Sequence, residues 1–112
     1  MRNSYILKYY VYVIDLDKKV LEKEKKFRDA NPQYVEGKPC VYVGQSYLKP
    51  RERYEQHKSG VRSNKYARKY GKWVKRKRIP NKNPHKTRKF AEIREAEVAK
   101  ILKARGWAVW WG

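Results

Sequence analysis

Five side chains in this sequence are of the types that together could hydrolyse a phosphodiester bond. Tyr12 and Tyr42 each stand between two valines, Arg53 and His57 are four positions apart, and Glu95 follows later in the chain. A carboxylate can hold a divalent cation, and an arginine can neutralise charge that develops on a phosphate. A tyrosine or histidine can move the proton of an attacking water. Tyrosines in strands are also common as packing residues, and Arg–His pairs on helices are often only solvated. Whether these side chains form a site therefore depends on the elements that position them.

The two tyrosines are expected on neighbouring strands. Residues 5–16 are rich in β-branched and aromatic side chains, and residues 40–44 form a second short strand. Pairing of these strands would bring the two hydroxyls together. Gly44 ends the second strand, where a phosphate could approach the backbone. Between the strands, apolar residues at helical spacing predict an inserted helix over 18–29.

The remaining candidates are expected on helices. Pro50 suits the first turn of a helix over 51–58, which would place Arg53 and His57 on one face. Ser63 could cap a short helix over 64–70. An edge strand is predicted over 72–79, and its lysines would discourage edge-to-edge aggregation. The longest helix runs from about Thr87 to 105, and residues 107–111 favour a short last strand.

Three glutamates on the longest helix compete for the role of metal carboxylate. Glu95 borders the apolar side of the helix, and no basic residue stands three or four positions from it. Glu97 projects roughly opposite and has Arg94 and Lys100 as salt-bridge partners, while Glu92 has basic residues one turn earlier. We therefore select Glu95, with Glu97 as the alternative. A semi-buried carboxylate would gain from binding a cation.

The charge points to a polyanionic partner. The 112 residues include 30 Lys and Arg against 11 Asp and Glu, a net charge of +19. No acidic residue occurs from 56 to 91, and this window supplies the further substrate-binding candidates Lys65, Arg68, Lys69, Lys72 and Arg76. Tyr66, Tyr70 and Trp73 interleave with them, either as stacking platforms or as core residues.

Length and composition exclude several classes. A chain of 112 residues is expected to form one domain over 1–112, too short for a (β/α)₈ barrel or a doubly wound enzyme. It contains no run of about 18 apolar residues that could span a membrane. The single cysteine, Cys40, excludes an internal disulfide and a cysteine-based zinc site. A cytoplasmic location is the simplest expectation.

The order of these motifs resembles the GIY-YIG endonuclease family. Tyr10-Val11-Tyr12 is similar to the first half of the family signature and Val41-Tyr42-Val43-Gly44-Gln45-Ser46 to the second half. Arg53 and His57 follow at the family's spacing, and the glutamate-bearing helix comes last. The match runs in order over most of the chain.

The resemblance implies an α/β (α+β) fold with a three-stranded antiparallel sheet flanked by helices. It also implies hydrolysis of DNA phosphodiesters with one divalent cation, Mg²⁺ or Mn²⁺, on Glu95. Tyr12 would act as general base and Tyr42 would orient water or phosphate. Arg53 would contact the phosphate and His57 would occupy the family's His or Tyr position. Gly44, Gln45 and Ser46 of the second motif would contact substrate.

Three departures accompany the resemblance. Tyr10 replaces the glycine of the first motif, and 30 positions separate Tyr12 from Tyr42, which leaves room for the inserted helix. An asparagine common near the end of the family domain has no clear counterpart. Two other functions stay open: a basic nucleic-acid-binding module on the same fold that does not cut, and a basic RNA- or ribosome-associated protein.

Overall fold

β1 (Tyr10–Leu16) is one of the two inner strands of the sheet and pairs on both of its edges. The computed structural model describes residues 8–47, 50–59, 64–80 and 83–112. β1 is antiparallel to β2 (Cys40–Ser46) on one side and to β3 (Gly71–Val74) on the other. β4 (Ala108–Trp111) pairs with β2 in parallel, which gives the order β3-β1-β2-β4.

The expectation of a three-stranded antiparallel sheet is therefore wrong in its detail. Over the described ranges the sheet is mixed and has four strands, and the fourth is the short strand expected over 107–111. The long helix α5 (Arg88–Ala104) packs on the sheet and returns the chain so that β4 runs in the direction of β2. The third strand is also shorter than expected: it ends at Val74, although the Lys75 N–H still donates to the Val13 carbonyl at 2.7 Å, and the chain then turns through Arg78 with φ of 64°.

The inserted segment contains two short helices where one was predicted. α1 (Lys19–Lys23) and α2 (Lys25–Asp29) are separated by Glu24, whose backbone is extended. α3 spans Pro50–Ser59 and α4 spans Lys65–Tyr70, close to their predicted ranges. Asn64 caps α4 by accepting from the amides of Tyr66 and Ala67, whereas Ser63 lies outside the described residues.

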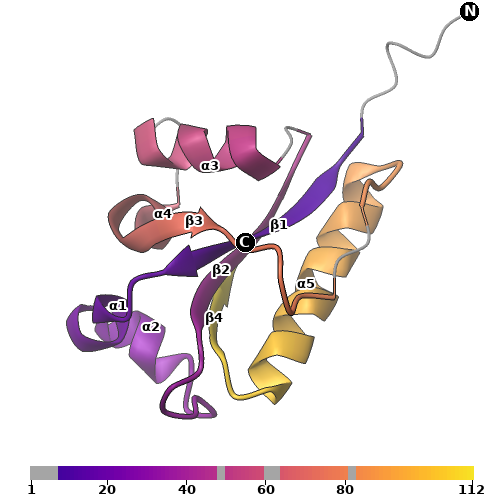
Figure 1. The fold of residues 1–112 in the computed structure, drawn as a ribbon. Coiled ribbons are helices and arrows are strands. Elements are labelled where there is room, and N and C mark those ends of the chain that lie inside the picture. The colour runs from indigo at the N-terminus through magenta and orange to yellow at the C-terminus, as the bar shows by residue number, and fades with distance from the viewer. Residues whose placement is uncertain (1–7, 48–49, 60–63, 81–82) are drawn as a thin grey trace, which may run out of the picture.

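The two faces of the sheet bury different sets of side chains. Alternation along β1 and β2 directs valines to one face, where they pack against α5. The opposite face is aromatic and lies under the other helices, as Figure 1 shows. The buried cluster between this face and those helices includes Tyr12, Ile14 and Tyr42 from the strands and Phe27 and Tyr66 from α2 and α4. No helix within the described ranges has the length and apolar character needed to cross a bilayer.

Side chains cover the outer edges of the sheet. The buried amide of Asn31 accepts from the N–H of Val109 at 2.7 Å and donates to its carbonyl at 3.1 Å, so it pairs with β4 as a strand residue would. On the other edge, the β3 carbonyls of Gly71 and Lys72 accept from Lys58 and Tyr54 of α3. These contacts satisfy main-chain groups that an edge strand would otherwise leave unpaired.

Replacing Asn31 should separate the inserted segment from β4. Asn31→Ala removes four hydrogen bonds, to Phe27, Gln33 and both main-chain groups of Val109. Because the Val109 groups would stay buried without partners, we expect the free energy of unfolding to fall by about 2–4 kcal/mol. Urea unfolding measures this change. The exposed Lys26→Ala, in the same segment, should change it by less than about 0.5 kcal/mol.

Candidate functional site

Four of the five predicted catalytic side chains line one open cleft of about 420 Å³. Tyr12, Tyr42, Arg53 and Glu95 come from β1, β2, α3 and α5 respectively. The two tyrosine strands are neighbours, and α3 and α5, which pack on opposite faces of the sheet, each contribute one of these side chains to the cleft. His57, the fifth, lies behind Tyr12 and is fully buried.

Strand register explains how the tyrosines meet. Tyr12 pairs with Gly44 and Tyr42 pairs with Ile14, so the two tyrosines are diagonal neighbours on one face, with ring centroids 6.1 Å apart. The Tyr12 ring lies over Gly44. A Cβ at residue 44 would lie 2.5 Å from Tyr12 Cζ and closer still to the hydroxyl. Gly44 therefore provides the space for Tyr12, and its backbone is covered rather than open to a phosphate.

Two hydrogen bonds fix the imidazole of His57. The backbone N–H of Asn64 donates to His57 Nδ1 at 2.8 Å, so Nδ1 carries no proton. The neutral ring then carries its proton on Nε2, which donates to the Tyr12 hydroxyl oxygen at 2.9 Å. Burial and the nearby Arg53 lower the pKa of His57 to about 4, which keeps the ring neutral at neutral pH.

Arg53 supplies the second donor to Tyr12. Its Nε–H donates to the Tyr12 oxygen at 3.3 Å, from one turn before His57 on α3. The predicted shared face of these two residues is therefore confirmed. Burial raises the pKa of Tyr12, while Arg53 opposes that rise. Burial, with Tyr12 and Glu95 nearby, raises the pKa of Tyr42 further.

Glu95 is a carboxyl group in an unfavourable place for charge. It is 9% exposed, and burial followed by the neighbouring Glu92 raises its pKa to about 7. Glu92 also lines the cleft, where it pairs with Arg88 at 3.2 Å. Glu97, the alternative metal carboxylate, is exposed, does not line this cleft and pairs with Arg94 at 3.1 Å.

The second signature motif contributes one more residue to the cleft. Gln45 lines it, and its buried Oε1 has no hydrogen-bond partner among the described residues. Ser46 ends β2 beyond Gln45 and does not line the cleft. Gln45 therefore lines the cleft and holds a buried acceptor oxygen, whereas Gly44 contributes to the site by making room for Tyr12.

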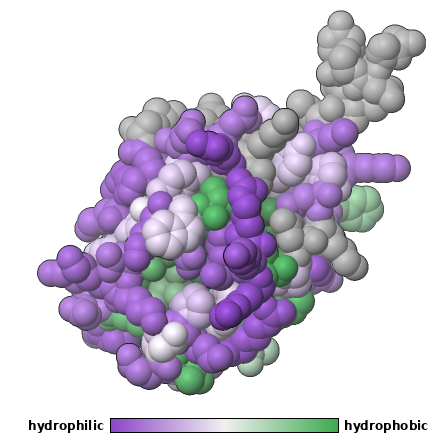
Figure 2. Space-filling view, viewed as in Figure 1, coloured by the Kyte–Doolittle hydropathy of each residue, from purple (hydrophilic) through white to green (hydrophobic). Residues whose placement is uncertain are grey.

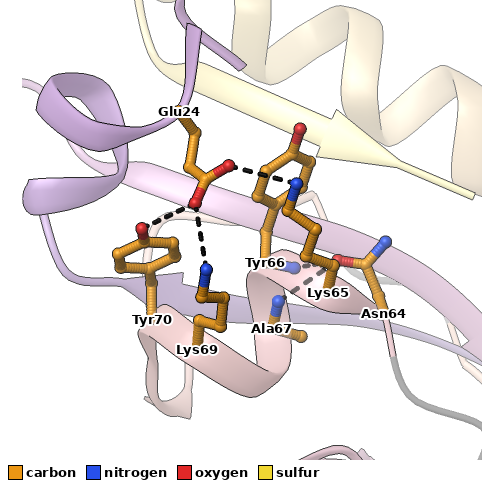
Figure 3. A network of polar contacts seen from close by, with 7 residues as sticks. All are labelled: Glu24, Asn64, Lys65, Tyr66, Ala67, Lys69 and Tyr70. Atoms are coloured by element: carbon orange, nitrogen blue, oxygen red, sulfur yellow. Dashed lines mark hydrogen bonds and ion pairs between the residues drawn. The ribbon is translucent and has the colours of Figure 1, made fainter. Parts of the chain in front are cut away.

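The structure does not bring the basic candidates into the cleft. Lys65 and Lys69 of α4 lie 3.3 and 3.5 Å from the carboxylate of Glu24 in the inserted segment (Figure 3). Tyr70 donates to the same carboxylate, and these contacts lower the pKa of Glu24. Lys72 covers the ring of Trp73, and Arg68 and Arg76 are exposed. Of the interleaved aromatic residues, Tyr66 is core and Trp73 is 56% exposed.

Asn64, Arg88 and Glu92 contribute to the site but were not selected for it from the sequence, although Glu92 was considered as a metal carboxylate. Asn64, through its main chain, selects the tautomer of His57, and no side-chain pattern announces such a contact. Arg88 and Glu92 line the cleft, although their spacing alone indicates only a surface ion pair. Helical spacing could have identified Arg88 and Glu92, because residues 88, 92 and 95 lie on one side of α5.

Comparison of the chain with models of protein families, with curated proteins and with solved structures found no match. A function for this chain is therefore argued from the geometry and chemistry of the cleft.

Neutralising Glu95 should make stability less sensitive to pH. The native pKa of about 7 exceeds the ordinary value of 4.5, so the native state holds a proton that the unfolded chain loses between these values, and stability falls as pH rises through them. Relative to the parent protein, the free energy of unfolding of Glu95→Gln should therefore rise by about 3 kcal/mol between pH 4 and pH 8.

Urea unfolding of both proteins at the two pH values measures this difference. Glu97→Gln is the matched control, because this carboxylate is exposed on the same helix. The difference in the free energy of unfolding between Glu97→Gln and the parent should change by less than about 0.5 kcal/mol between the two pH values. If both variants changed equally with pH, the result would contradict the conclusion that ionisation of Glu95 destabilises the folded state.

Proposed function

We propose that the protein is a divalent-metal-dependent endonuclease that hydrolyses DNA phosphodiester bonds in the cleft between β1, β2, α3 and α5. The observation that supports this most is the convergence of two phenols, a guanidinium and a buried carboxyl group on one open cleft. These are the groups that hydrolysis of a phosphodiester requires: a base, a cation for the phosphate and a carboxylate for a metal.

Tyr12 is suited to take a proton from water. Burial raises the pKa of Tyr12 and favours the phenol, whereas Arg53 and His57, which donate hydrogen bonds to its oxygen, favour the phenolate. To act as a base, Tyr12 would first lose its phenol proton to water in the open cleft. The phenolate would keep both contacts and have a further lone pair for the proton of the attacking water. Because His57 is a neutral donor on Nε2, it holds Tyr12 in place and does not compete as the base.

Arg53 and Tyr42 are suited to bind the phosphate. The Arg53 guanidinium lines the cleft beside the Tyr12 hydroxyl, so a phosphate next to the attacked water would lie within its reach. It would stabilise the negative charge that grows on the phosphate oxygens. The pKa of Tyr42 is raised, so this residue remains a phenol that donates a hydrogen bond and orients the water or the phosphate.

The donor set fits a magnesium or manganese ion. Among the residues that the structure describes, no three His, Cys, Asp or Glu side chains gather as an ion-binding group. Mg²⁺, however, often uses one or two carboxylates and keeps several waters. Glu95 would hold the ion, with Glu92 and the unused Gln45 oxygen on the same cleft. When bound, the ion would polarise the phosphate and help a water to ionise.

The surface favours a polyanionic substrate. The net charge is +19, and the face seen in Figure 2 is largely hydrophilic with only small separate hydrophobic patches. Charged contacts of this kind hold the DNA backbone without reading bases. We therefore propose DNA as the partner, bound through its phosphates on either side of the cleft.

Removing the Glu95 charge should abolish cleavage. Purified protein with Mg²⁺ or Mn²⁺ should nick a supercoiled plasmid, and Glu95→Gln should lower the rate by about 10³-fold or more because the metal loses its carboxylate. Glu97→Gln should cut at the parental rate. Mg²⁺ should also raise the melting temperature of the parent and of Glu97→Gln at pH 8, but not that of Glu95→Gln.

Removing one hydroxyl should separate catalysis from binding. Tyr12→Phe should lower the nicking rate by about 10²–10⁴-fold, since the base is lost, while affinity for DNA stays within about twofold. Tyr34→Phe is the control, because its hydroxyl donates to the Lys38 carbonyl, remote from the cleft. DNA binding without cleavage by the parent, on duplex, flap and junction substrates, would instead identify a non-catalytic nucleic-acid-binding module.

A further inference from the structure

A second set of hollows lies at the other end of the sheet. One, of about 670 Å³, lies between the segment 37–39 and the segments that contain Arg78 and Arg105. Another, of about 220 Å³, lies between residues 37–40 and Trp73. The two share Gly37 and Pro39 and together form one surface, which we name the far groove.

The far groove is separate from the cleft. Its floor includes Leu16 and Cys40, which pair at one end of β1 and β2, whereas the cleft lies at the level of Tyr12 and Gly44. Four residues of strand separate these levels, about 13 Å at the usual rise per residue. One extended polymer can therefore contact both, but none of the side chains that the structure describes lines both.

Positive charge dominates the far groove. Its cations are Lys18, Lys38, Lys72, Arg78 and Arg105. The carboxylate that lines it is that of Asp15, which accepts from the Trp73 indole at 2.9 Å and pairs with Lys75 at 3.5 Å. Since that negative charge is already matched by partners, the five cations favour an anionic ligand.

Trp73 gives the groove a surface on which a base can stack. The ring is 56% exposed, although large aromatic residues are usually well buried. Its N–H is tied to Asp15, and the Lys72 ammonium lies 5.0 Å from the ring centroid. The ring is thus held in a fixed orientation with much of its area open to solvent.

We propose that the far groove binds single-stranded DNA, with a base on Trp73 and backbone phosphates on the surrounding cations. Cations that follow a backbone beside an aromatic ring are the features by which proteins bind single strands. A duplex would offer phosphates but no free base face for the indole. The choice of DNA over RNA rests on the proposed function, since a strand held here would lead to or from the cleft.

Binding of a fluorescent 12-nucleotide oligo(dT), measured by anisotropy in EDTA, tests the proposal without cleavage. Trp73→Ala should weaken binding about tenfold, because one base loses its stacking partner. Trp111→Ala is the matched control: this tryptophan is 40% exposed and has the Lys103 ammonium 5.7 Å from its ring, but it lies outside the far groove. It should change the affinity by less than twofold.

A second pair of variants tests the cations. Lys18→Gln with Lys38→Gln should weaken binding and reduce the slope of log affinity against log salt by about 1.4, from about 0.7 per phosphate contact. Lys26→Gln with Lys100→Gln removes the same charge from exposed positions elsewhere and should leave the slope nearly unchanged.

Equal effects of the groove variants and their controls would overturn the proposal in favour of attraction by net charge alone. Tighter, Trp73-dependent binding of oligo(U) would overturn the choice of DNA. Because these measurements involve no metal and no cleavage, their failure leaves plasmid nicking untouched. Failure to nick, in turn, leaves the binding result intact.

Discussion

The neutral imidazole of His57 is the constraint on which the arrangement of the cleft depends. Its Nδ1 is held by the main chain at the start of α4, and its Nε2 holds the Tyr12 oxygen. Tyr12 in turn occupies the space left by Gly44 and receives Arg53. Four elements are thereby joined through one buried ring, so that a small domain fixes reactive groups without a large core.

Much of the fold could be predicted because periodicity is a local property. The alternation in β1 and the 3.6-residue pattern of α5 are visible in the sequence, and both elements are present. The direction of β4 was not predictable in this way, since it depends on where α5 packs. Nor was the break at Glu24, where an extended residue interrupts a helical pattern and directs its carboxylate to α4.

The site was predictable to the extent that its residues belong to ordered motifs. Tyr12, Tyr42, Arg53 and Glu95 meet in one cleft, and the choice of Glu95 over Glu97 from helix geometry agrees with their burial. Net charge was a poorer guide to individual roles. Lys65 and Lys69 pair with the carboxylate of Glu24, which lies more than 40 positions earlier in the chain. The absence of acidic residues from 56 to 91 could not indicate this partner, because Glu24 lies outside that window.

The side chains that cover the outer edges of β3 and β4 affect whether copies of the protein would aggregate when they are crowded together. A protein with a net charge of +19 would be concentrated on a polyanion to a local density far above that in bulk solution. At such a density, exposed strand edges would favour aggregation through pairing of strands from different molecules. Here Asn31 occupies the edge of β4, and Lys58 and Tyr54 occupy that of β3. On the polyanion that we propose as its partner, neighbouring copies could therefore lie side by side while each retains its own fold.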